Sequence, residues 1–198
     1  MKIVGVGCGP GMLTEQAIRE ISRASVIYGS DRAIDLAKSI ILPGCTVKTI
    51  DDFKKLDTLQ LDILPDNTVV LSTGDPMLAG LGYLAGDVVP GISSFQLAAA
   101  RLKIPISRMS VVVAHGRGHE KGREDTLEEV RRGRIVFLLA DPKFDARKLY
   151  AELRELSLPV RIALCENLGY PDECILIRDI QSPPWPTKAL YSLVIGVF

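Results

Sequence analysis

The sequence opens with Lys2-Ile3-Val4-Gly5-Val6-Gly7-Cys8-Gly9-Pro10-Gly11, a short apolar run that ends in a glycine-rich loop. The β-branched residues predict a buried strand over residues 2–6. Glycines after a first strand permit a tight turn and let a ligand approach the backbone closely. The loop is therefore a candidate ligand site, and a tight turn with no ligand is the alternative explanation.

The spacing of these glycines argues against a dinucleotide site. The G-x-G-x-x-G pattern read from Gly5 places Pro10 at its last glycine, and the pattern read from Gly7 places Met12 there. The loop also resembles the first motif of Rossmann-type methyltransferases, but the residue before the glycines is not acidic. A third explanation is a glycine loop at the mouth of a different methyltransferase fold.

Beyond the loop, short apolar runs alternate with amphipathic segments. In the first half, Thr14 can cap a helix, strands are expected at 25–28, 47–50, 68–72 and 87–89, and helices at 31–39, 77–85 and 93–102. In the second half, strands are expected at 110–114, 135–139, 160–164, 174–177 and 190–197, and helices at 125–132 and 145–156. Because strands that alternate with helices pair in parallel, we expect two α/β domains, 1–107 and 108–198.

Two further loops follow predicted strands at the edge where ligands bind in open α/β sheets. Thr73-Gly74-Asp75-Pro76 follows the strand at 68–72, and Pro90-Gly91-Ile92-Ser93-Ser94 follows the strand at 87–89. The Asp75 carboxylate can accept hydrogen bonds from ribose hydroxyls or offset a sulfonium charge, or it can cap the next helix. These two loops and the glycine loop together indicate a ligand site more strongly than any one of the three does alone.

The bulk composition limits the kinds of ligand. Hydrophobic residues make up 47% of the chain and charged residues 24%, with a formal net charge of zero, as in an ordinary globular protein. No global positive field attracts nucleic acid or an anionic membrane, so neither is an expected partner. The four cysteines lack C-x-x-C spacing, no apolar run reaches transmembrane length, and no leader pattern opens the chain. We therefore expect a cytoplasmic protein with free thiols and no zinc site.

The three loops together resemble a known family. G-x-G-P-G-x-x-T at residues 7–14, G-D-P at 74–76 and P-G-I-S-S at 90–94 are similar in order and spacing to the tetrapyrrole (corrin and porphyrin) methylases, which use S-adenosylmethionine on a non-Rossmann fold. His115-Gly116-Arg117 and the run Glu166-Asn167-Leu168-Gly169-Tyr170-Pro171-Asp172-Glu173 look like the cobalt-precorrin-7 (C5)-methyltransferase branch.

The resemblance implies an α/β fold of two domains with the cofactor in a cleft between them, and a homodimer. It implies that S-adenosylmethionine contacts residues of both halves of the chain, namely Pro10, Gly74, Asp75, Leu78, Gly91, Ile92, Ser93, Leu139 and Cys165. The segment between Met77 and Pro90 is short for the family, which puts Leu78 in more doubt than Asp75. Many members of this branch carry a fused C15-methyltransferase/decarboxylase domain, and here we expect a separate protein to supply that chemistry.

In this branch the methyl group goes to ring carbon C5 of a cobalt-precorrin, a substrate that carries many carboxylates. A neutral protein binds such a substrate through a local basic patch, because arginine pairs with carboxylate through two hydrogen bonds. The candidates are His115, Arg117, Lys121 and Arg123, in a predicted glycine-broken loop that also holds His119. A solvated loop is the alternative. Since Gly116 and Gly118 argue against a helix, we expect no metal between the two histidines, and no single residue is identified as a catalytic base.

Other functions remain open at this stage. Another methylase of the same family, including a diphthine synthase-like enzyme, would act on a different precorrin position or on a protein side chain. A Rossmann-type methyltransferase would use an acid after the second strand, where Asp31 stands. A dinucleotide-dependent oxidoreductase or a nucleotide sensor is the more distant alternative.

Overall fold

The chain folds into two compact units. The computed structural model describes residues 1–50, 65, 67–115 and 118–198, and it divides into Met1–Ser94 and Phe95–Phe198. The division falls earlier than the expected position near residue 107, because helix α5 (Ser94–Leu102) packs with the second unit. Its Phe95 ring lies 5.5 Å from the Phe137 ring, and its Arg101 forms an ion pair with Glu173.

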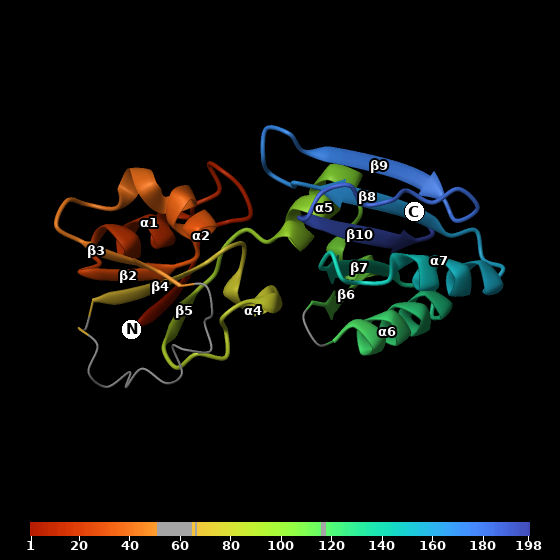
Figure 1. The fold of residues 1–198 in the computed structure, drawn as a ribbon, viewed down its shortest axis with the longest axis horizontal. Coiled ribbons are helices and arrows are strands. Elements are labelled where there is room, and N and C mark those ends of the chain that lie inside the picture. The colour runs from red at the N-terminus through yellow and green to blue at the C-terminus, as the bar shows by residue number, and fades with distance from the viewer. Residues whose placement is uncertain (51–64, 66, 116–117) are drawn as a thin grey trace. The chain divides into compact units, whose positions relative to one another are not determined.

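The first unit contains a parallel sheet (Figure 1). Its described strands are β1 (Lys2–Gly5), β2 (Val26–Gly29), β3 (Thr46–Thr49), β4 (Thr68–Ser72) and β5 (Asp87–Val89), in the order β3-β2-β4-β1-β5. Every pairing in this sheet is parallel, as the alternating pattern predicted. The Rossmann order would place β1 beside β2, whereas here β4 lies between them. The strand order therefore separates this fold from the Rossmann alternative.

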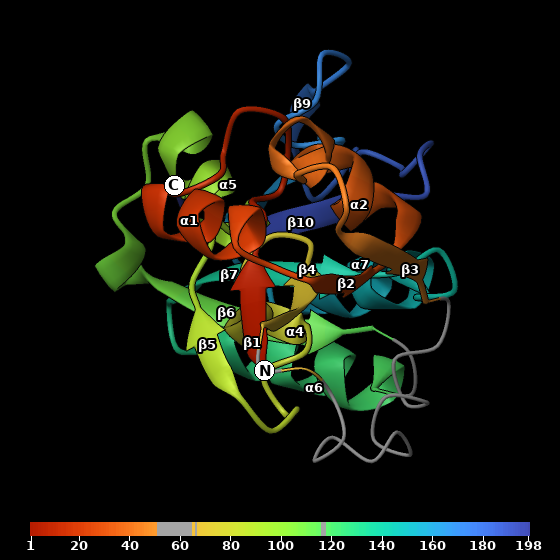
Figure 2. The ribbon, with the colours of Figure 1, turned by 90° about the vertical axis from the view of Figure 1, so that its left-hand side faces the viewer.

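Helices α1 (Glu15–Ser22) and α2 (Asp31–Ala37) cover one face of the sheet (Figure 2). Thr14 caps α1 as predicted, since its hydroxyl oxygen accepts a hydrogen bond from the Ala17 amide at 3.1 Å. A 3-10 helix at Lys38–Ile40 follows α2. The main apolar cluster of this unit lies between the helices and the sheet and includes Val4, Ile21, Ile27 and Leu71.

The helix predicted over residues 77–85 is much shorter in the structure. Helix α4 covers Pro76–Ala79 and ends at Gly80, whose φ of −113° and ψ of −127° are not helical. Leu81 and Leu84 instead turn back into a small buried cluster with Ile3 and Val70 on the other face of the sheet. Gly80 and Gly82 lie within the nine residues of the predicted helix, and glycines so close together favour a turn over a helix.

The second unit contains a mixed sheet. Its described strands are β6 (Met109–Ala114), β7 (Ile135–Ala140), β8 (Arg161–Glu166), β9 (Cys174–Asp179) and β10 (Tyr191–Gly196), in the order β6-β7-β10-β8-β9. A 3-10 helix at Ile106–Arg108 precedes β6. Strands β6 and β7 are parallel, and the other three pairings are antiparallel.

The main core of this unit lies on the sheet face covered by α6 (His119–Arg131) and α7 (Ala146–Glu155), as Figure 1 shows. Leu138, Leu149, Leu153 and Leu193 are fully buried there. Phe137 alternates with Leu138 along β7, so it points to the opposite face, where it meets Phe95 of α5. Among the described residues, no helix is long and apolar enough to cross a membrane.

Candidate functional site

Three loops meet at the carboxyl ends of the neighbouring strands β4, β1 and β5. The glycine loop after β1 joins the G-D-P loop through a pair of backbone hydrogen bonds between Gly7 and Gly74, at 3.2 and 2.8 Å. The P-G-I-S-S loop follows β5, which pairs with the other side of β1. The structure therefore brings together the three motifs that the sequence identified, at the sheet edge where open α/β folds bind ligands.

The glycines in these loops are required by close backbone contacts. A Cβ atom added to Gly91 would lie 2.2 Å from the Gly74 carbonyl oxygen, and one added to Gly5 would lie 2.6 Å from the Gly91 nitrogen. Gly7 and Gly74 have φ values of +80° and +74°, in the left-handed region that favours glycine. A side chain at Gly5 or Gly91 would therefore separate the loops.

Asp75 fixes two of the loops relative to each other. Its Oδ1 accepts a hydrogen bond from the Met77 amide at 2.7 Å, which caps α4, and its Oδ2 accepts one from the Gly91 amide at 3.0 Å. Of the two roles considered for this residue, the geometry supports capping. A direct contact of Asp75 with a ligand stays a prediction.

The other predicted cofactor residues of the first unit differ in exposure. Ile92 presents 37% of its surface, Pro10 is exposed and Leu78 is half-buried. Gly91 and Ser93 are buried. Ile92 and Pro10 therefore offer apolar surface to a ligand at these loops, whereas Gly74, Gly91 and Ser93 shape the backbone.

In the second unit, the predicted cofactor residues Leu139 and Cys165 lie in one row across the sheet. Both are paired with Ser192 of β10, Leu139 from β7 and Cys165 from β8. Directly opposed residues in an antiparallel pair share a face, so these side chains point the same way. Burial, with a smaller contribution from the Glu173 charge, raises the pKa of the Cys165 thiol to about 12, so this thiol is neutral at physiological pH.

The predicted basic loop is largely a helix, which corrects the sequence interpretation. His119, Lys121 and Arg123 lie in the first turns of α6, and Arg117 lies outside the described residues. His115 is exposed just after β6. Lys121 is also exposed, and its Nζ lies 2.8 Å from the Asp125 carboxylate, four residues along the helix.

Arg123 is buried rather than presented to a ligand. Its side chain is 9% exposed, and its guanidinium group donates to Glu120 at 2.6 Å and to Glu152 of α7. The hydrogen bond that Arg123 donates to Glu120 is the main cause of a raised Arg123 pKa. Arg123 thus fastens α6 to α7, and its predicted contact with substrate carboxylates receives no support from this geometry.

In the run Glu166–Glu173, Glu166 ends β8 and the other residues form the turn to β9; its two glutamates fix the loop before β10 and this turn, respectively. Glu166 is buried, and its carboxylate accepts hydrogen bonds from the Thr187 amide at 2.6 Å and the Lys188 amide at 2.8 Å. Glu173 accepts from the Gly169 amide and pairs with Arg101. Burial acts to raise the pKa of Glu166, but these hydrogen bonds outweigh it, and the pKa lies below its usual range.

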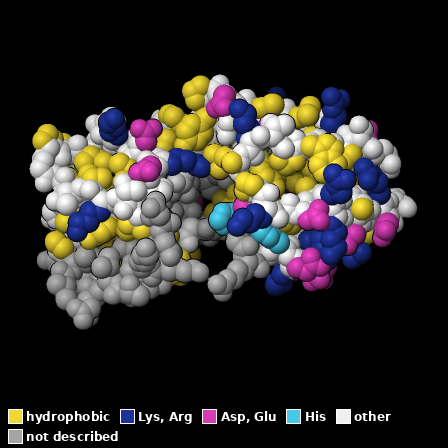
Figure 3. Space-filling view, viewed as in Figure 1, with side chains coloured by type: hydrophobic (Ala, Val, Ile, Leu, Met, Phe, Trp, Pro, Cys, Tyr) yellow, Lys and Arg dark blue, Asp and Glu magenta, His cyan; other side chains and the backbone are white. Residues whose placement is uncertain are grey.

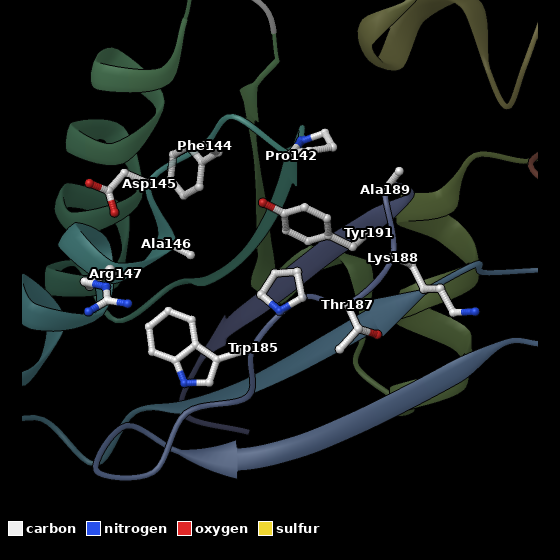
Figure 4. A pocket seen from close by; sticks show the side chains of 11 residues that line it. Pro142, Phe144, Asp145, Ala146, Arg147, Trp185, Thr187, Lys188, Ala189 and Tyr191 are labelled. Carbon is white, nitrogen blue, oxygen red and sulfur yellow. The ribbon is translucent and has the colours of Figure 1, made fainter.

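A pocket in the second unit was not found by sequence reasoning. It has a volume of about 470 Å³ and lies between the loop that leads into α7 and the loop before β10 (Figure 4). The Arg147 guanidinium lies 5.7 Å from the centre of the Trp185 ring, and that ring packs on Tyr150. Lys188 lines the same pocket. The only tryptophan in the chain, set between prolines in Pro183-Pro184-Trp185-Pro186, was the signal that could have found it.

The comparisons with known proteins agree with the loop geometry. The model of the tetrapyrrole (corrin/porphyrin) methylases matches residues 2–183. A Methanocaldococcus jannaschii protein named "Probable cobalt-precorrin-7 C(5)-methyltransferase" is 32% identical, over 89% of this chain and 88% of that protein. A Sinorhizobium precorrin-6Y C(5,15)-methyltransferase (decarboxylating) is 32% identical over 129 residues, and the match spans 30% of that longer protein.

Solved structures share the fold. A precorrin-6Y methylase from Archaeoglobus fulgidus superposes with a TM-score of 0.75 at 30% identity, covering 99% of this chain and 97% of that one. A uroporphyrin-III C-methyltransferase from Thermus thermophilus, crystallised with S-adenosylhomocysteine, has a TM-score of 0.70 at 21% identity and covers 98% and 91%. With the family model matching most of its length, the chain belongs to the tetrapyrrole methylases.

Proposed function

We propose that this chain transfers a methyl group from S-adenosylmethionine to ring carbon C5 of a cobalt-precorrin in cobalamin biosynthesis. The observation that carries the proposal is the convergence of three glycine-containing loops at the carboxyl ends of β4, β1 and β5. The name of the Methanocaldococcus relative supports the ring position and the metal state of the substrate.

The loops suit S-adenosylmethionine in shape and chemistry. The proposed contacts are the backbone at Gly74, Gly91 and Ser93 and the apolar surfaces of Pro10, Leu78 and Ile92, with Asp75 as the residue that positions the loops. Leu139 and Cys165 are proposed as contacts from the second unit. The cofactor, when bound, supplies an electrophilic methyl group on a sulfonium.

The protein's own contribution is to align the two reactants and to exclude water, which lowers a barrier without a covalent intermediate. We assign recognition of substrate carboxylates to His115, Arg117 and Lys121 and add Arg147 and Lys188, which line the pocket of the second unit. Arg123 is omitted because two carboxylates already hold its guanidinium group. A homodimer and a separate C15-methyltransferase/decarboxylase complete the proposal.

Calorimetry with S-adenosylhomocysteine tests the cofactor assignment, with NADH as the control ligand. Ile92→Ala is the informative variant, because Ile92 is 37% exposed and its aliphatic side chain, unlike Asp75, makes no hydrogen bond between the loops. Truncating such a contact should weaken binding by about tenfold. Ile106→Ala is the matched control, since Ile106 is 49% exposed in the 3-10 helix before β6. Binding of NADH alone, or equal affinity in both variants, contradicts the assignment.

Incubation with S-adenosylmethionine and cobalt-precorrin-7 tests the reaction. The expected product is heavier by one methyl group in place of one hydrogen, and its NMR spectrum carries the new methyl signal at C5. A methyl group at another ring carbon would redirect the proposal to a different member of the family. A methylated protein side chain would favour the diphthine synthase-like alternative.

A further inference from the structure

A histidine and an aspartate form a pair in the second unit, at the carboxyl ends of two neighbouring parallel strands. Strands β6 and β7 are in register up to Ala114 and Ala140. His119 begins helix α6 shortly after β6, and Asp141 directly follows β7. His119 Nε2 and Asp141 Oδ2 are 2.9 Å apart. Functional groups of α/β proteins gather at this edge of a parallel pair.

The partner of the imidazole fixes which of its nitrogens is basic. An ionised carboxylate can only accept, so Nε2 must carry a proton and donate it to Asp141. In the neutral ring Nδ1 then holds the lone pair and can take up a proton. No described residue forms a hydrogen bond with Nδ1.

The pair is held in place and remains accessible. Asp141 Oδ1 accepts a hydrogen bond from the Lys143 amide at 2.8 Å, and its carbonyl oxygen accepts one from the Tyr191 hydroxyl at 3.1 Å. The His119 ring packs edge-on against Phe144. Its side chain is 27% exposed, and the histidines (cyan in Figure 3) reach the surface of the second unit. An oriented, partly exposed base of this kind is the arrangement that proton transfer requires.

We infer that His119, oriented by Asp141, accepts the proton that the substrate loses when its ring carbon is methylated; this rests on the proposed function. The ring carbon gives an electron pair to the methyl carbon while the carbon–sulfur bond breaks and leaves its electrons on sulfur. The macrocycle thereby gains one positive charge. Loss of one proton from the methylated carbon to Nδ1 of His119 removes that charge, and the imidazolium is stabilised by Asp141.

His119→Gln separates this role from a structural one. The glutamine amide can still donate to the Asp141 carboxylate, so the link between α6 and the loop after β7 is kept while the basic nitrogen is lost. We expect the single-turnover rate of methyl transfer to cobalt-precorrin-7 to fall about 100-fold, in line with the loss of a general base. The affinity for S-adenosylhomocysteine should be unchanged. Glu128→Gln, an exposed change on the same helix, should leave both quantities at the wild-type value.

A second measurement needs no substrate, and its main readout is taken on the wild-type protein. Histidine labelled with ¹⁵N reports the tautomer of each imidazole by NMR, and in the wild-type protein at alkaline pH His119 should be protonated on Nε2. Asp141→Ala should remove that preference. A neutral His119 protonated on Nδ1 overturns the inference.

The remaining outcomes distinguish the inference from the proposed function. Wild-type protein that methylates the precorrin, with His119→Gln equally fast, refutes the role of His119 and leaves the proposed function intact. Wild-type protein that binds S-adenosylhomocysteine but methylates no precorrin refutes the proposed function, and the role of His119 falls with it.

Discussion

Replacing Gly91 with alanine should destabilise the first unit and abolish binding of S-adenosylhomocysteine. The added Cβ would lie 2.2 Å from the Gly74 carbonyl oxygen and 2.9 Å from backbone carbons of Gly5. These neighbours are main-chain atoms at the ends of β4 and β1, so no side-chain rotation can relieve the contact. The loop after β5 must therefore move away from the other two.

The cost follows from two contributions. Overpacking at a site that cannot relax costs about 3 kcal/mol. The displacement also breaks the 3.0 Å hydrogen bond from the Gly91 amide to Asp75, which is worth about 1 kcal/mol. We therefore expect a loss of about 4 kcal/mol in the free energy of unfolding of the first unit. Gly44→Ala is the control: Gly44 has a φ of +92° and open space around its Cβ position, so that variant should lose only about 1 kcal/mol.

Urea unfolding followed by far-UV circular dichroism measures both variants. Trp185 is the only tryptophan in the chain and packs on Tyr150 in the second unit, so its fluorescence follows that unit separately. For Gly91→Ala, the midpoint of unfolding measured by circular dichroism should lie at a lower urea concentration than the midpoint measured by fluorescence. If Gly91→Ala is no less stable than Gly44→Ala and still binds S-adenosylhomocysteine, the close packing of the three loops is not what requires glycine here.

Three further changes have defined outcomes. Glu166→Gln should lower the free energy of unfolding by about 2 kcal/mol at neutral pH, because a buried carboxylate loses its charge-assisted hydrogen bonds. The folded-state pKa of Glu166 lies below its unfolded value. Urea titrations at several pH values should therefore show the stability difference between the wild-type protein and Glu166→Gln above about pH 4, and the difference should vanish as the pH falls further. Arg123→Gln should lower Tm by about 4 °C in a calorimetric scan, because Glu120 and Glu152 lose their shared partner. Thr14→Ala should lower the free energy of unfolding by about 1 kcal/mol in urea titrations, because it removes the cap of α1. The far-UV ellipticity of the folded protein should stay unchanged.

Much of the first unit was predictable because its signals are local. Strand β4, with three apolar residues at its centre, is buried along its whole length, and the hydroxyl of Thr14 caps α1 as its position before an amphipathic segment indicates. The glycine, G-D-P and P-G-I-S-S loops each follow a strand, as predicted. The order of the strands, which makes β4, β1 and β5 neighbours and so brings these loops together, was not predictable, because nothing in the sequence places β4 between β1 and β2.

The second unit was harder to predict from the sequence, because its structure depends on contacts between segments that are far apart in the chain. Helix α6 begins at His119, six residues before the predicted start. The spacing of Lys121 and Asp125 is that of a helical ion pair, a signal that the prediction of a glycine-broken loop did not use. Arg123 was grouped with basic residues that might face a ligand, because its buried partner Glu152 lies 29 residues away in the sequence.

Two acidic residues from the motifs that carry the family resemblance hold loops together in the structure, and this determines how the site should be tested. The Asp75 carboxylate accepts a hydrogen bond from the Met77 amide in its own loop and one from the Gly91 amide in the next loop. The Glu166 carboxylate accepts hydrogen bonds from the Thr187 and Lys188 amides before β10, so neither carboxylate can bind a ligand without giving up contacts that hold a loop. A variant at either position would weaken cofactor binding even if the residue never touched the cofactor. Loss of binding in Asp75→Ala therefore cannot identify a contact. Ile92 is the better probe, because its side chain is 37% exposed and makes no hydrogen bond between the loops. A binding defect in Ile92→Ala with an unchanged free energy of unfolding therefore points to a contact with the ligand.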